Sequence, residues 1–180
     1  MAYGSVAEIL EAIDETRARL QEKVGELSAA QEQFRPTPDA WSIAEIIEHL
    51  TIFEERMSRL FTMMVKKAES AGAQVAGQSF RPVSLDQFIE RSLKEKYTAP
   101  ETVRPSGQVP VADSLARMRR SRAELHGLRP KLEAIDLSGM TYPHPAFGPL
   151  NLYQWLALIG MHEDRHLRQV ESIMSSPQFD

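Results

Sequence analysis

Long segments of this sequence carry apolar residues at every third or fourth position, which is the repeat of one face of an α-helix. The strictest segment follows Trp41, and its apolar positions are Ile43, Ile46, Leu50, Phe53, Met57, Leu60 and Met64. Steps of this kind are typical of a helix that packs lengthwise against other helices. The repeat therefore predicts an architecture in which such helices lie side by side.

The same repeat predicts three more long helices, over Ser5 to Leu27, Asp113 to Ile135 and Leu152 to Ile173. The helix after Trp41 has a well-marked start, because Ser42 with Glu45 three residues later has the spacing of a capping box. For the third long helix we expect Asp113 as the N-cap. Pro130 is expected to kink or divide that helix, since proline lacks an amide hydrogen and crowds the preceding turn.

The connection between the second and third long helices is longer than a tight turn requires. Between Ser70 and Pro110 the helical repeat loosens, and only Ser84 to Tyr97 predicts a short amphipathic helix. An excursion of this length either covers a site as a lid or spans the bundle as a crossover strap, and the sequence leaves both open. The proline-rich stretches Gln31 to Ala40 and Gly139 to Pro149 are predicted as loops, and no segment alternates convincingly enough to be a strand.

These elements predict an all-α fold, an up-down four-helix bundle with a short extra helix in the long connection. A chain of 180 residues fits a single domain, residues 1–180, that can bury its apolar side chains without disulfides. The hydrophobic content of 42% and the charged content of 26% are those of an ordinary globular protein.

Charge and composition argue against several kinds of partner. Lysine and arginine total 21 against 25 acidic residues, so the formal net charge of −4 gives no basic field for nucleic acid or an anionic membrane. The chain has no cysteine, so thiol chemistry would need an external thiol. We find neither a signal-peptide pattern nor an uncharged run of the ~18 residues that a membrane span needs, and we expect a cytoplasmic protein.

Two histidines continue the buried stripe of the last helix. His162 and His166 lie four residues apart, one turn along the same face, so their rings can hold one metal ion between them. The alternative is a pair of core histidines that hydrogen-bond to neighbours. On the second helix, His49 lies on the flank of the buried face, where it could reach into the bundle or remain partly exposed.

Two other residues could carry chemistry but have simpler explanations. Arg122 interrupts the stripe of the third helix and could bind an anionic substrate group or a buried carboxylate, although we favour a side chain that extends to solvent. His144 lies in the last loop, where an isolated histidine is usually just exposed.

The stretch His162-Glu163-Asp164-Arg165-His166 also satisfies the H-E-x-x-H pattern, in which two histidines bind zinc and the glutamate activates water. The context argues against a zinc protease. Only fourteen residues follow His166, none of them a histidine, and no predicted strand precedes the helix to bind a peptide substrate.

The blocks around these histidines resemble the DinB/YfiT-like superfamily. The first block, W-S-I-A-E-I-I-E-H-L from Trp41 to Leu50, is similar to its W-S-x-x-E-x-x-x-H-L signature. His144 to Leu150 and the later His162 to His166 are similar to its second half. The order and spacing of the blocks match over nearly the whole chain, and the excursion from Ser70 to Pro110 is the least characteristic part.

The resemblance implies a four-helix bundle with a three-histidine metal site, whose positions are occupied here by His49, His162 and His166. Three imidazole ligands leave coordination positions open for water or substrate, as in a catalytic site. A divalent transition metal is expected, and zinc, nickel, iron and manganese all accept imidazole. Relatives often dimerise, so we also expect a homodimer.

Characterised relatives include bacillithiol- and mycothiol-dependent transferases, and many other members are regarded as hydrolases. The resemblance therefore implies a metal-dependent enzyme of hydrolase or thiol-transferase type that acts on a small-molecule substrate, with a low-molecular-weight thiol as partner in the second case. The metal would lower the pKa of a coordinated water or thiol. The alternative is a non-catalytic bundle that binds a metal or small ligand in a stress response.

Glu163 borders the same face of the last helix as the two histidines, about 100° from His162 and about 60° from His166. It could therefore accept a proton as a general base, or else make an outer contact or an ion pair with a basic neighbour. We expect a catalytic role to appear as lost activity in Glu163→Gln with the metal retained.

Overall fold

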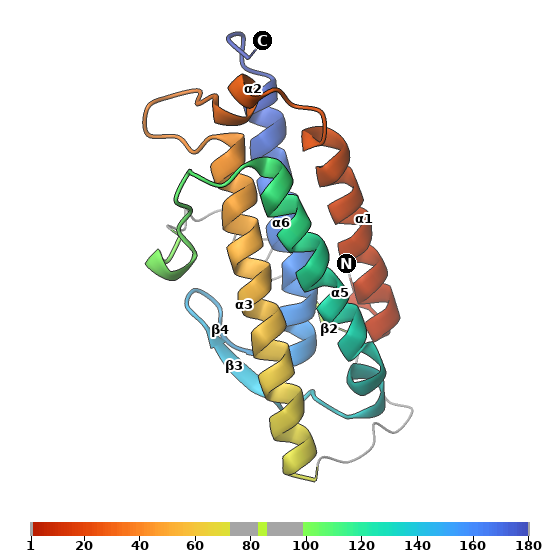
Figure 1. Cartoon of the computed structure of the whole chain (residues 1–180). Coiled ribbons are helices and arrows are strands. Elements are labelled where there is room, and N and C mark those ends of the chain that lie inside the picture. The colour runs from red at the N-terminus through yellow and green to blue at the C-terminus, as the bar shows by residue number, and fades with distance from the viewer. Residues whose placement is uncertain (1, 73–82, 86–98, 180) are drawn as a thin grey trace.

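Four long helices form the body of the molecule in the computed structural model, which describes residues 2–72, 83–85 and 99–179 (Figure 1). They are α1 (Val6–Val24), α3 (Ile43–Ser70), α5 (Val111–Ala134) and α6 (Leu152–Met174). The predicted all-α four-helix bundle is confirmed. The short helix predicted over Ser84 to Tyr97 lies almost entirely outside the described residues.

The long connection carries the chain back to the end of the bundle at which α3 begins. Thr51 on α3 donates a hydrogen bond to the carbonyl of Ser114 near the start of α5, and Glu69 near the end of α3 pairs with Lys131 near the end of α5. The two helices are therefore parallel (Figure 1). In chain order the long helices run up, down, down and up, so the alternation of an up-down bundle is interrupted once, at this crossover.

Capping side chains set the start of the two helices that will carry the site. Ser42 accepts a hydrogen bond from the amide of Glu45, whose carboxylate accepts from the amide of Ser42, so the capping box predicted for α3 is confirmed. Asn151 and Gln154 form the same reciprocal pair at the start of α6. We did not predict that second pair.

α5 differs from the prediction at its start, and the division that was one of the two outcomes expected at Pro130 does not occur. The helix begins at Val111, and the residue before it is Pro110, which has no side-chain cap, so the assignment of Asp113 as N-cap is wrong. Proline suits a helix start because it has no amide hydrogen that needs a partner. The helix also continues through Pro130 to Ala134 without dividing, and the fully buried Leu132 packs its last turn against the core.

Among the described residues, two short two-stranded sheets accompany the bundle, so the expectation of no strands is wrong. β1 (Ala2–Tyr3) pairs with β2 (Val83–Ser84), and β3 (Thr141–His144) pairs with β4 (Gly148–Asn151). The sequence predicted a loop where the β3–β4 hairpin lies. Pro143 and Pro149 are register partners in this hairpin, and neither can donate a hydrogen bond between the strands. Gly148 has a φ of +76°, the left-handed conformation that closes the turn.

In the described parts of the connections, there are two shorter helical elements. α2 (Ala29–Gln33) overlaps the first predicted loop and begins with a capping box between Ser28 and Gln31. A 3-10 helix, η1 (Glu101–Val103), lies near the end of the long connection. None of the described helices combines the length and the apolar character that crossing a bilayer requires.

Each long helix contributes one charged side chain to a buried ion cluster, formed by Arg17 of α1, Glu54 of α3, Arg122 of α5 and Glu163 of α6. Arg122 is only 7% exposed and also donates to Asp14 and to the carbonyl of Ile13. The prediction that Arg122 extends to solvent is therefore wrong, and the alternative of a buried carboxylate partner is correct. Because removing one partner of a buried ion pair costs about 3–5 kcal/mol, the cluster strongly favours this alignment of the four helices.

Candidate metal centre

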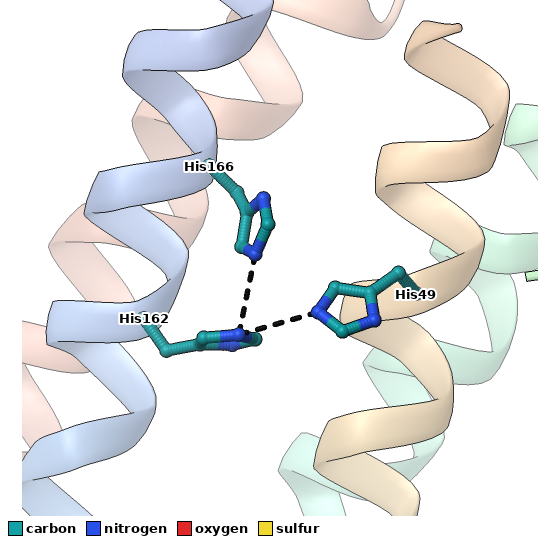
Figure 2. A group of neighbouring side chains, drawn as sticks. All are labelled: His49, His162 and His166. Atoms are coloured by element: carbon teal, nitrogen blue, oxygen red, sulfur yellow. Dashed lines mark hydrogen bonds between the residues drawn. The ribbon is translucent and has the colours of Figure 1, made fainter. Parts of the chain in front are cut away.

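Figure 2 shows three histidine rings turned toward one another, His49 from α3 and His162 and His166 from α6. The Nε2 atom of His162 lies 3.3 Å from that of His49 and 3.2 Å from that of His166. Nitrogens bound to one tetrahedral zinc ion are about 3.3 Å apart, so this spacing suits a shared metal. The structure brings together the three histidines that the sequence indicated, and His49 is buried rather than partly exposed.

Hydrogen bonds on the far side of two rings fix which nitrogen carries the hydrogen. The Nδ1 atom of His49 lies 2.7 Å from the carbonyl oxygen of Val103, and Nδ1 of His166 lies 2.6 Å from Oε1 of Gln169. A carbonyl oxygen only accepts, so both Nδ1 atoms donate and both Nε2 atoms present lone pairs to the cluster. Outer bonds of this kind orient histidines as metal ligands.

His162 completes the cluster but has no such outer partner. Its Nδ1 atom is buried and forms no hydrogen bond within the described part of the chain. Its Nε2 atom faces the lone pairs of both other rings, and a single hydrogen on that atom could bond to only one of them at a time. A cation shared by the three nitrogens would satisfy all of them together, so these residues fit a metal ion.

Burial keeps the three rings in the neutral form that binds metals. It lowers the pKa of His49, although the hydrogen bond to Val103 opposes the shift. It also lowers the pKa of His166 to about 3, and it holds the pKa of His162 well below its usual value, helped by the two neighbouring rings. At neutral pH no imidazole therefore has to lose a proton before it binds a cation.

A cavity of about 910 Å³ opens beside the three histidines. Its walls are mainly apolar and include the side chains of Trp41, Phe53, Met57, Phe147, Trp155 and Leu158. Residues 99, 100, 102 and 103, at the end of the long connection, also line it, so this part of the excursion covers the site as well as crossing the bundle. The volume is in the range of small-molecule binding sites.

Glu163 points into the buried ion cluster rather than toward the three Nε2 atoms. Its carboxylate accepts hydrogen bonds from Arg17 and Arg122, and the residue is 1% exposed. Burial raises the pKa of this carboxyl, and the two guanidinium groups oppose the rise. The placement favours the ion-pair role over the role of general base, both of which the sequence left open.

Three residues beside the histidines were not assigned to the site from the sequence. Val103 contributes only its backbone carbonyl, which no side-chain pattern reveals. Gln169 lies one turn after His166, and this spacing could have indicated an outer partner. His144, expected to be exposed, is half-buried and lines the cavity, because Trp155 holds the β3–β4 hairpin against α6 by donating to the carbonyl of Tyr142.

A family model described as the DinB superfamily matches residues 12–170, which is most of the chain. The chain belongs to the DinB superfamily. This DinB superfamily member is similar to the uncharacterized protein YuaE of Bacillus subtilis (strain 168). The two sequences are 28% identical over 166 residues, and the match covers 89% of this chain and 93% of YuaE.

Two solved structures share the fold of this DinB superfamily chain. TT2238, described as a four-helix bundle protein, has a TM-score of 0.61 at 22% identity, and the match covers 93% of this chain and 99% of TT2238. YfiT from Bacillus subtilis, described as a probable metal-dependent hydrolase with an unusual four-helix bundle topology, has a TM-score of 0.63 at 15% identity, over 94% of this chain and 87% of YfiT. These likenesses support the four-helix bundle.

Proposed function

We propose that this protein is a metal-dependent enzyme of hydrolase or thiol-transferase type, in which His49, His162 and His166 bind one divalent transition metal. The observation that carries the proposal is the convergence of three imidazole nitrogens beside a cavity large enough for a small molecule. Structural zinc sites usually have four protein ligands, whereas three ligands leave a position for water or substrate.

The side chains around the site would hold the ion and exclude bulk water. The bonds from Val103 and Gln169 keep two Nε2 lone pairs directed at the ion position. When bound, the ion would lower the pKa of a coordinated water or thiol and so supply a nucleophile near neutral pH. The apolar walls of the cavity would bind the body of the substrate. Zinc, nickel, iron and manganese all suit imidazole ligands.

The two reaction types differ in the nucleophile. Hydrolysis has the support of YfiT, which shares the fold and is described as a probable metal-dependent hydrolase. Thiol transfer would need a low-molecular-weight thiol as a second small molecule, because the chain has no cysteine, and the cavity volume leaves room for one beside a small substrate. Both reactions would use the same three histidines.

Assays with and without an added thiol test this proposal. The metal-loaded protein is given 4-nitrophenyl acetate for hydrolysis, and 1-chloro-2,4-dinitrobenzene with a low-molecular-weight thiol for transfer. We expect turnover in one of the two assays, its loss in His162→Ala and on chelation, and its recovery when the metal is restored. Arg168→Ala is the control, because Arg168 is exposed on the same helix and pairs with Asp164.

Absence of turnover in both assays with the metal bound would contradict the enzyme proposal. It would favour the alternative class, a non-catalytic bundle that binds a metal or small ligand.

A further inference from the structure

The turn between β3 and β4 fixes the hydrogen position on the ring of His144. Its Nδ1 atom accepts hydrogen bonds from the backbone amides of Ala146, at 3.1 Å, and Phe147, at 3.2 Å. A backbone amide only donates, so Nδ1 must carry a lone pair. In the neutral ring the hydrogen then lies on Nε2, which becomes a hydrogen-bond donor.

Neighbouring aromatic rings hold His144 in one orientation. Its ring stacks on Phe147, with centroids 4.5 Å apart and an interplanar angle of 16°, and lies 5.1 Å from the ring of Trp155. Trp155 belongs to α6 and donates to the carbonyl of Tyr142, so the hairpin is tied to the helix that carries two of the site histidines. Burial also lowers the pKa of His144, which favours the neutral ring at pH 7.

The donor on Nε2 has no partner in the described ranges 2–72, 83–85 and 99–179, although His144 is half-buried and lines the cavity. Nε2 of His144 is not fully enclosed by protein atoms, so it can donate to a molecule that binds beside it. The cavity walls include the side chains of Phe53, Trp155 and Leu158, which cannot accept this hydrogen bond. An oxygen of a ligand bound in the cavity would accept this hydrogen bond.

We propose that the cavity binds a small molecule with an apolar, aromatic-sized body and a carbonyl-type oxygen, and that the Nε2 hydrogen of His144 donates to that oxygen. This inference rests on the proposed function in that such a molecule would be the substrate of the metal site. His144 is then a specificity residue, because a cavity with a fixed donor rejects analogues that lack the acceptor.

A matched pair of probes measures this preference without any assay of activity. Acetophenone carries a carbonyl oxygen, whereas ethylbenzene has nearly the same shape and no acceptor. Binding of each to the protein as purified is followed by chemical-shift changes of the backbone amides. The ratio of the two dissociation constants is then compared among the wild type, His144→Phe, His144→Gln and the control Leu158→Val.

We expect acetophenone to bind more tightly than ethylbenzene in the wild type, and the ratio to fall about tenfold in His144→Phe, which keeps an aromatic ring but has no donor. His144→Gln carries an amide donor near the position of Nε2 and should recover part of the preference. Leu158→Val changes the apolar wall and leaves the ring contacts of His144 in place, so any loss of affinity should affect both probes equally. Long-range nitrogen spectra of His144 should also show hydrogen on Nε2.

An unchanged ratio in His144→Phe, or hydrogen on Nδ1, would overturn the assignment. The ratio is measured again on chelated protein to separate this inference from the metal proposal. A preference that depends on His144 and survives chelation supports the donor even if no metal site exists. A preference that disappears with the metal and survives in His144→Phe would instead show that the metal binds the carbonyl.

Discussion

At the scale of single residues, Gln169 is the side chain that orients His166. Its Oε1 atom accepts the Nδ1 hydrogen of His166 at 2.6 Å, and this bond leaves the Nε2 lone pair facing the cluster. We expect Gln169→Ala to weaken metal binding by about 10- to 100-fold, because outer partners fix the tautomer and direction of ligand histidines. Competition with a chromophoric chelator measures the change.

A second glutamine near the end of the chain provides the control for this experiment. Gln178 is exposed and bonds to Ser176 rather than to any site residue, so Gln178→Ala should bind metal as the wild type does. Equal affinities in the two variants would show that Gln169 does not orient the ligand.

Glu163→Gln separates the two roles of Glu163. The substitution removes one negative charge from the cluster with Arg17 and Arg122, so we expect the free energy of unfolding to fall by about 3 kcal/mol. Metal content and turnover of the folded protein should stay close to wild type. A fall in turnover of about 100-fold or more, with the fold and the metal intact, would instead support the general-base role.

The lowered pKa values of the three histidines predict that acid destabilises the metal-free protein. His49, His162 and His166 stay neutral in the fold but take up protons in the unfolded chain below pH of about 6.5. The unfolded state then binds more protons, so stability falls as the pH drops from about 6.5 toward the folded pKa, which for His166 is about 3.

Urea unfolding of the chelated protein between pH 7 and pH 5.5 measures this dependence. Each neutral histidine adds a slope of up to about 1.4 kcal/mol per pH unit. The slope should be smaller in His162→Ala. The same slope in both proteins would contradict the assignment of neutral, buried rings.

At the residue scale, the sequence predicted the candidate metal-ligand histidines but not the groups that form hydrogen bonds with them. His162 and His166 could be predicted as a pair because a four-residue step places two side chains on one helix face. The partner of His49 is a backbone carbonyl 54 residues away, so no local pattern encodes it. Arg122 was misplaced because a helical repeat shows that a charge faces inward but not whether carboxylates from other helices meet it.

At the scale of elements, the close approach of α1 and α6 depends on Gly160. A Cβ atom added there would lie 2.9 Å from Cγ2 of Ile13, which is a β-branched side chain with little freedom to move. We expect Gly160→Ala to lower the free energy of unfolding by about 1–3 kcal/mol, the usual cost of overpacking. Chemical denaturation measures it.

Gly127 on α5 is the matched control for Gly160. It is exposed and nothing lies within 4 Å of an added Cβ atom, so Gly127→Ala should be neutral or stabilise by up to about 1 kcal/mol through helix propensity. Similar effects of the two substitutions would show that α1 and α6 are not in close contact at Gly160.

The elements differ in how well their sequences predict them. α3 could be predicted closely because a capping box and a long apolar repeat agree on it. The β3–β4 hairpin could not, because two prolines oppose each other in its ladder and its stability comes from packing on Trp155 of α6. Local sequence patterns predict an element when hydrogen bonds within that element stabilise it. They do not predict an element that is stabilised mainly by contacts with residues distant in the sequence.

At the scale of the whole molecule, the crossover links the fold to the site. It lets α3 and α6 lie antiparallel, so that His49 meets His162 and His166 (Figure 2), and its last residues cover the cavity. The sequence predicted the bundle, but it left open whether the excursion was a strap or a lid, and residues 99, 100, 102 and 103 serve both purposes. Three further expectations remain predictions: that the chain forms a single domain, that the protein is a homodimer, and that it is located in the cytoplasm.

The metal content of the purified protein tests the central claim most directly. Elemental analysis should find close to one transition-metal ion per chain in the wild type, and much less in His49→Ala, His162→Ala and His166→Ala, each checked for helical content by circular dichroism. His126→Ala should keep the metal, because His126 lies on α5 and pairs with Asp14. Full metal occupancy in folded His49→Ala would contradict the three-histidine site and leave at most the pair on α6.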